Sequence, residues 1–189
     1  FRILSVVLLI GFLDRTRGLT ASCAYGTADF DGQYGCQLRI ISSESPDGFE
    51  IIGGEHLPDY SDDNVRKLSA IDSIIKFVPA EMFQKFRFLE NLDMKQVEMI
   101  KLAKDGENSL VNCESLKYLD CDDNELMELL KVFDNCVNLM SILLTNNRIE
   151  SIAVGVFEKL TNLKTLNLGC NKISQIESEL FQNLKKVEE

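Results

Sequence analysis

The sequence predicts an α/β solenoid in which short parallel strands stack into one sheet and irregular segments return the chain along the opposite side. Two observations predict this fold. An apolar pattern recurs five times between residues 65 and 187, and residues 21–64, which precede it, do not follow the pattern. Self-similarity with a period of roughly 20 to 50 residues is typical of repeat architectures. The chain has 189 residues, 45% of them hydrophobic, which suffices for the core of one domain.

The first residues resemble a secretory signal peptide. Residues 3–13 form an apolar run after Arg2, and the charged segment 14–17 ends the run. A membrane span needs about 20 apolar residues, so we expect no membrane span within this chain. We expect a signal peptide at about residues 1–20 whose true start is missing, because the chain does not begin with Met. The alternative is a buried core segment. A signal peptide implies an extracellular, secreted protein in an oxidising compartment.

Residues 21–64 are expected to form an N-terminal cap. Cys23 and Cys36 bracket a polar, Gly-rich stretch. Residues 37–41 alternate as a strand should, and residues 49–52 predict a second short strand after a turn. A cap is needed because no repeat unit buries its own apolar side alone.

The repeat is clearest in its last three copies. Residues 163–176 read LKTLNLGCNKISQI, with apolar residues at the first, fourth, sixth, eleventh and fourteenth positions. The ninth position is occupied, from the last copy to the first, by Asn171, Asn147, Asn124, Val97 and Ser73. The expected units are residues 65–88, 89–115, 116–138, 139–162 and 163–186, and the longest carries a polar segment at 103–109. The first two units are degenerate, but they retain the inward apolar pattern, so we expect them to stack like the others.

Each copy predicts one short strand. Two apolar residues separated by one polar residue, as in Leu166, Asn167 and Leu168, point alternate side chains inward. Stacked copies place these strands about 4.8 Å apart as a parallel sheet. The Asn at the ninth position is expected to bond otherwise orphaned backbone groups in the turn. With 23 to 27 residues per unit, the return limb is too short for a full helix, so we expect irregular or 3₁₀ structure there.

This pattern, LxxLxLxxNxL with a trailing LPxxxFxxLxxL, resembles the leucine-rich repeat over residues 65–187. The resemblance implies a horseshoe solenoid with the parallel β-sheet on its concave face. The segment CQLRIISS to NVRKL, residues 36–68, is also similar to the region before the repeats in small secreted arthropod leucine-rich repeat proteins. That second resemblance implies an N-terminal β cap closed by a disulfide between Cys23 and Cys36.

The other cysteines lie in the repeats. Cys113 and Cys136 occupy the same inward position in adjacent units, so stacking allows the roughly 4.4 to 6.8 Å between Cα atoms that a disulfide requires. A disulfide is one interpretation, and two small buried thiols is the one we favour. Cys121 stands at an apolar position and is expected in the core. Cys170 lies at the edge of the concave face and is expected to be an exposed thiol, which permits a disulfide-linked oligomer.

The concave face carries the candidate partner-binding residues. They are the side chains between and just after the inward apolar positions, namely Asp93, Tyr118, Asp120, Asp122, Asp123 and Leu143. The four acids predict an acidic patch, with the two apolar side chains as anchors for the basic surface of a protein partner. The alternative is solvated charge that keeps the sheet face soluble.

We expect no catalytic residue, cofactor or metal. His56, the only His, has no Ser or Cys that spacing places near it. Residues 120–125, DCDDNE, faintly resemble a calcium loop, but Glu125 stands where Gly is needed and Lys131 where Glu is needed. The net charge of −10 also argues against a nucleic-acid partner, which requires a basic stripe to neutralise phosphates.

The sequence therefore predicts a secreted, non-enzymatic protein that binds a protein partner, of unidentified kind, through its concave sheet. The leucine-rich repeat resemblance implies a role in recognition, including innate immunity or cell-surface adhesion. One alternative is an ectodomain fragment of a membrane receptor or adhesion protein, and another is a protein inhibitor that uses the acidic face. The chain stops at residues 187–189, where a sixth unit would begin, so we expect a truncated C-terminus.

Overall fold

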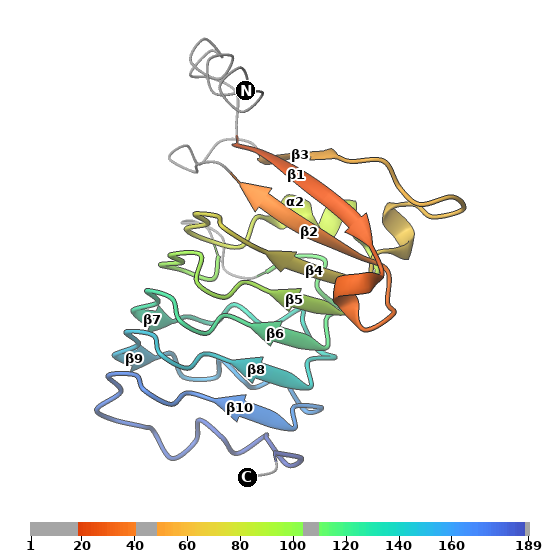
Figure 1. Cartoon of the computed structure of the whole chain (residues 1–189). Coiled ribbons are helices and arrows are strands. Elements are labelled where there is room, and N and C mark those ends of the chain that lie inside the picture. Colours follow the sequence, from red (N-terminus) through yellow and green to blue (C-terminus); the bar gives the residue numbers. More distant parts are fainter. Residues whose placement is uncertain (1–18, 41–48, 104–109, 188–189) are drawn as a thin grey trace.

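One sheet runs the length of the described chain, which in this computed structural model comprises residues 19–40, 49–103 and 110–187 (Figure 1). The strands of this sheet follow the order β10-β8-β6-β5-β4-β2-β1-β3. Their bounds are β1 Leu19–Gly26, β2 Gly35–Ile40, β3 Phe49–Gly53, β4 Lys67–Ala70, β5 Asn91–Asp93, β6 Tyr118–Asp120, β8 Ser141–Leu143 and β10 Thr165–Asn167. The expected signal peptide, apart from its last two residues, and the polar segment 104–109 lie outside the described residues.

The repeat strands are parallel, as predicted, and one apolar residue at the centre of each aligns with the next. Leu92 pairs with Leu119, and Leu119 with Ile142, and each is at most 1% exposed. The degenerate units stack in the same register, because Leu68 in β4 pairs with Leu92 and is also 1% exposed. The expectation that the first two units stack is therefore confirmed.

The cap joins the solenoid through its own strands. The two expected strands are present as β2 and β3, while β1 was not expected. β1 lies between them, antiparallel to β2 and parallel to β3, and β2 pairs in parallel with β4 of the first repeat. The Cys23–Cys36 disulfide, with Cα atoms 5.3 Å apart, links β1 to β2 and confirms the cap that the resemblance implied. The pattern did not predict β1 because it begins at Leu19, at the end of the expected signal peptide.

Asparagines complete the turn after the strand in each of the last three units, and two of them, Asn124 and Asn147, are buried. Asn147 Oδ1 accepts the backbone N–H of Leu126 in the preceding unit at 3.0 Å. Its Nδ2 donates to the carbonyl of Cys121 in that unit at 2.9 Å and to the carbonyl of Leu144 in its own unit at 3.2 Å. Asn124 and Asn171 do the same, accepting from Val97, Met99 and Ile149. Each amide thus bonds backbone groups of two units at once. The bonds within the turn were predicted, and the bonds to the preceding unit were not.

The residue before the ninth position of every repeat unit has a left-handed backbone. Its φ is 45° to 57° in all five units, at Asp72, Gln96, Asp123, Asn146 and Cys170. Asp and Asn tolerate this region better than other residues with a Cβ atom, and a thiol gives no such local support. Cys170 is exposed and unpaired, as expected, and it shares with Gln96 a positive φ without an Asp or Asn side chain to support it.

The convex side is mostly irregular, as predicted, with two departures. The first unit contains a short α-helix, α2 (Ala80–Lys85), built from strong helix formers, with Glu81 in its first turn and Lys85 in its last. The third and fourth units add β7 (Glu128–Leu129) and β9 (Ser151–Ile152), which pair in parallel. Inside this wall, Phe133 and Phe157 stack with ring centroids 6.4 Å apart.

Our favoured interpretation of Cys113 and Cys136 as two separate thiols is wrong. They form a disulfide, with Cα atoms 4.8 Å apart. The reason is geometric: equivalent positions in adjacent units lie one strand spacing apart, which is within the range that a disulfide needs. Cys121 is a fully buried free thiol, as expected.

Removing the Asn147 amide should strongly destabilise the solenoid. Asn147→Ala leaves the N–H of Leu126 and the carbonyl of Cys121 buried without this partner, so we expect the free energy of unfolding to fall by about 3 kcal/mol in urea denaturation. The matched control is Asn138→Ala, which removes one exposed bond to the Glu114 carbonyl and should lower stability by less than about 0.5 kcal/mol. Equal losses in the two variants would contradict the role given to Asn147.

Relieving the strain at Cys170 should stabilise the protein. Cys170→Asn places a residue that tolerates positive φ at a position with φ 54°, and we expect the free energy of unfolding to rise by about 0.5 kcal/mol. Cys170→Ser removes the thiol without supplying the amide and serves as the control. Thermal or urea denaturation in reducing buffer checks this, and the idea fails if the Asn variant is no more stable than the Ser variant.

Candidate functional site

Four of the six expected partner-binding residues border one cavity on the concave face, which is the outward side of β4, β5, β6, β8 and β10. Parallel pairing sets Asp93 beside Asp120 and Asp120 beside Leu143. Tyr118 lies two residues before Asp120 on the same side of β6 and is 45% exposed. These four side chains border a cavity of about 350 Å³, so the structure brings them together.

The other two expected residues, Asp122 and Asp123, do not line this cavity. Asp122 Oδ1 accepts the backbone N–H of Thr145 at 2.6 Å. Asp123 Oδ1 accepts a side-chain N–H of Asn146 at 2.9 Å. Both carboxylates therefore tie the third unit to the fourth, and the expected acidic patch divides into a cavity part and a connecting part.

Lys95 partly neutralises the acids at the cavity. Its Nζ lies 2.8 Å from Asp120 Oδ2. The hydrogen bond to Asp120, together with the charges of Asp120, Asp93 and Asp122, raises the pKa of Lys95 despite its partial desolvation. The remaining oxygen of Asp120 accepts the Asp122 N–H at 3.1 Å. Asp120 is thus an internally paired acid, whereas Asp93 has no Lys, Arg or His side chain within 4.0 Å in the part of the chain described.

The cap supplies the second wall of the cavity. The short 3₁₀-helix η2 (Ala28–Phe30) and the following Asp31 place Asp29, Phe30 and Asp31 on the cavity edge. Lys67 Nζ lies 2.8 Å from Asp31 Oδ2, which fixes the cap segment to β4. This pair lowers the pKa of Asp31. Sequence reasoning missed this wall, because residues before the repeats have no repeat phase to place them. The only available signal was the strand at 37–41, whose pairing with β4 brings the wall to the sheet.

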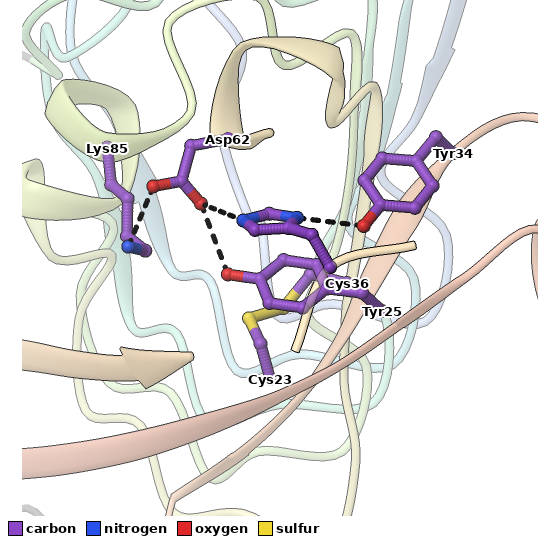
Figure 2. Close-up of a disulfide and its surroundings, with 7 residues drawn as sticks. Cys23, Tyr25, Tyr34, Cys36, Asp62 and Lys85 are labelled. Atoms are coloured by element: carbon purple, nitrogen blue, oxygen red, sulfur yellow. Dashed lines mark hydrogen bonds and ion pairs between the residues drawn. A yellow bond between two sulfur atoms is a disulfide. The ribbon is translucent and has the colours of Figure 1, made fainter. Parts of the chain in front are cut away.

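A second cluster of polar side chains holds the cap against the first repeat. Figure 2 shows Asp62, of the 3₁₀-helix η3 (Asp62–Asn64), between Lys85 of α2 and Tyr25 of β1. Asp62 Oδ1 accepts the Tyr25 hydroxyl at 3.2 Å and Oδ2 accepts Lys85 Nζ at 2.9 Å. Burial raises the pKa of Tyr25, and so do the charge and hydrogen bond of Asp62. Asp62 therefore links the cap to the helix of the first repeat.

His56 belongs to this cluster and lies against aromatic rings. Its ring stacks on Tyr25 with centroids 4.0 Å apart. The Tyr34 hydroxyl accepts the N–H of Leu57 at 3.3 Å and lies 2.8 Å from His56 Nδ1. Donation of the Tyr34 proton to Nδ1 leaves the ring proton on Nε2, which lies 3.2 Å from Asp62 Oδ1. Burial raises the pKa of Tyr34. These contacts give His56 a structural role inside the cap.

The described residues were also compared with the expectations that the chain holds no metal and has no membrane span. Within residues 19–40, 49–103 and 110–187, no group of three or more His, Cys, Asp or Glu side chains is arranged to hold a metal ion. Asp120 and Asp122, in the segment that faintly resembles a calcium loop, accept backbone N–H groups. Over these ranges no helix has both the length and the apolar character needed to cross a membrane.

Replacing Tyr25 should change how stability depends on alkaline pH. The folded state holds the Tyr25 proton above the ordinary pKa of 10.0, so this group's contribution is complete below pH 10.0 and is lost as pH rises toward the folded pKa. We expect Tyr25→Phe to lose about 1 kcal/mol at neutral pH with the bond to Asp62. Above pH 10.0 its free energy of unfolding should fall less steeply than that of the wild type. Urea denaturation at several pH values checks this, and parallel curves would contradict it.

Comparison with known proteins agrees with this architecture. The family model described as leucine rich repeat matches residues 137–189. A search of curated proteins finds no match to the chain. Among solved structures, the leucine-rich repeat domain of APL1 is similar with a TM-score of 0.67 and 20% identity, over 89% of this chain and 41% of that one.

Two solved complexes contain similar solenoids. The LRIM1/APL1C complex matches with a TM-score of 0.55 and 20% identity, over 87% of this chain and 33% of that one. The complex of TLR13 with ssRNA13 matches with a TM-score of 0.59 and 24% identity, over 66% of this chain and 17% of that one. The chain thus spans less than half the length of each of these proteins. The described residues have the leucine-rich repeat fold, and residues 137–189 match the leucine rich repeat family itself.

Proposed function

We propose that this chain is a secreted, non-enzymatic recognition protein whose concave face binds a protein partner. The observation that carries the proposal is the cavity of about 350 Å³ on that face, with a 45% exposed Tyr118 at its border. Concave sites with an apolar floor and a few polar groups are the usual place for binding. Asn124 and Asn147 fix the turns after β5, β6 and β8 beneath the cavity, and the Lys67–Asp31 ion pair ties β4 to the cap. The face is therefore preorganised and loses little conformational entropy on binding.

Side-chain chemistry favours a protein partner. Tyr is enriched at the centres of protein interfaces because its ring buries a large area with few rotatable bonds. Tyr118 and Leu143 supply such anchors, and the surrounding Asp side chains favour a basic partner surface. LRIM1/APL1C is a complex of leucine-rich repeat proteins, and TLR13 is bound to ssRNA13. The net charge of −10 favours a protein over a nucleic acid as the partner of this chain, because negative charge on the protein repels the negative phosphates.

Two disulfides support an extracellular location. Cys23–Cys36 closes the cap and Cys113–Cys136 links adjacent repeats. Such bonds persist in oxidising compartments and are rare in the cytosol. The apolar run at residues 3–13, which lies outside the described residues, supports secretion through its resemblance to a signal peptide. In that compartment the exposed thiol of Cys170 is available for a disulfide with another chain, and we retain this pairing as part of the proposal.

A bulky substitution on the concave face should weaken partner binding strongly. Ser141 lies beside Tyr118 across the strand pair and borders the cavity. We expect Ser141→Arg to weaken binding by about tenfold or more, because the side chain fills the cavity and adds a positive charge. The measurement is capture of extracellular proteins from the source organism on the immobilised chain, with quantification of each captured protein and titration of the enriched ones.

The matched control is Met127→Arg, which adds the same side chain at a 56% exposed position next to β7, on the opposite side of the solenoid. Both variants should keep the urea denaturation curve of the wild type. A partner that binds Ser141→Arg as well as the wild type, but loses affinity for Met127→Arg, would overturn the assignment of the concave face.

A further inference from the structure

The cavity on the concave face is lined by two parts of the chain, the cap and the repeats. The side chains of both parts determine which chemical group it binds. The repeats contribute Asp93, Tyr118 and Asp120, and the cap contributes Asp29 and Asp31. The cap wall is fixed in place by the Lys67–Asp31 ion pair at 2.8 Å. A second tie is the hydrogen bond from Asn91 Nδ2 to Gln33 Oε1 at 3.2 Å. The cavity is therefore a preformed pocket between cap and sheet.

Charge inside the pocket is unbalanced. Four carboxylates, those of Asp29, Asp31, Asp93 and Asp120, line it against one cation, Lys67. Asp31 is paired with Lys67, and Asp120 with Lys95, which stands outside the lining. Among the described residues, Asp29 and Asp93 have no such cationic partner. Asp93 Oδ1 accepts the N–H of Lys95 at 3.2 Å, and its Oδ2 receives only a 3.5 Å contact from Ser69 Oγ. One carboxylate on each wall thus lacks a charged partner.

Aromatic and apolar surface accompanies these free acids. Tyr118 is 45% exposed at the pocket border. Leu143, in register with Asp120, is half-buried beside it. A guanidinium group suits such a lining because it is planar, forms forked hydrogen bonds with carboxylates and stacks on aromatic rings. An ammonium group has the charge but not the flat faces.

We propose that this pocket takes an arginine side chain from the partner, held between Asp29 and Asp93 and stacked on Tyr118. The inference rests on the proposed function and names the chemistry of the bound group. At about 350 Å³ the pocket is at the small end of the roughly 300–1,000 Å³ of ligand sites, which suits one long side chain with its adjoining backbone.

The test uses three small probes, namely the N-acetyl amides of arginine, lysine and glutamine, added to the isotope-labelled chain and followed by NMR. We expect saturable shifts for the arginine probe at the amides of the pocket residues, weaker shifts for lysine, and none for glutamine. Asp93→Asn and Asp29→Asn should each weaken arginine binding by about threefold to fivefold. Tyr118→Ala should weaken arginine binding more than lysine binding, because only the guanidinium stacks.

The control variant is Glu158→Gln, which removes the same charge on the convex side, where Glu158 pairs with Lys131 at 3.1 Å. It should leave arginine binding unchanged, and dispersed spectra should confirm that every variant is folded. Saturable binding of the glutamine probe, equal weakening by Glu158→Gln, or the absence of saturable arginine binding would overturn the inference. If Ser141→Arg still weakens capture of a partner by about tenfold or more while the arginine probe does not bind, the proposed function stands and the arginine pocket fails.

Discussion

The structure depends on satisfying the backbone polar groups where the chain leaves each repeat strand. A buried turn without partners for its N–H and carbonyl groups is costly, and the solenoid repeats this turn in every unit. Asn124, Asn147 and Asn171 meet the need with one amide each, which bonds its own unit and the one before it. This shared bonding fixes the register of the strands, and the register in turn sets Asp93, Asp120 and Leu143 in one row.

The same constraint explains why the early part of the solenoid is built differently. Val97 and Ser73 occupy the asparagine position in the first two units, so neither supplies an amide to its predecessor. Ser73 donates to the carbonyl of Ile71 at 2.6 Å, and the N–H of Ile75 donates to the carbonyl of Val97 at 2.7 Å. Stability at this end comes instead from the cap, through the Cys23–Cys36 disulfide and the contacts of Asp62. The cap thereby also positions the second wall of the pocket.

Sequence pattern predicted the parts of the molecule that repeat. The phase of the apolar residues predicted the parallel strands and the turn asparagines, because periodicity reports which side chains face inward. It did not predict β1, which begins at the end of the expected signal peptide, nor α2, where the local propensity of residues 80–85 prevails in one unit only. The spacing of Cys113 and Cys136 in the sequence allowed either a disulfide or two separate thiols, and it did not distinguish between them. The contact between the cap wall and β4 depends on pairing across the sheet, which has no local signature in the sequence.

The fate of the acidic residues shows why composition alone does not locate a binding site. All four predicted acids lie at the concave end of their units, yet two of them bond the next unit and a third is paired with Lys95. Of these four acids, only Asp93 has neither a cationic partner nor a bond to the next unit among the described residues. The cap adds Asp29, which the repeat pattern did not indicate. An acid that is paired within the fold stabilises the scaffold, whereas an acid held at the surface without a cation attracts one from outside. Recognition by this chain is therefore expected where the cap meets the sheet, and not evenly along the repeats.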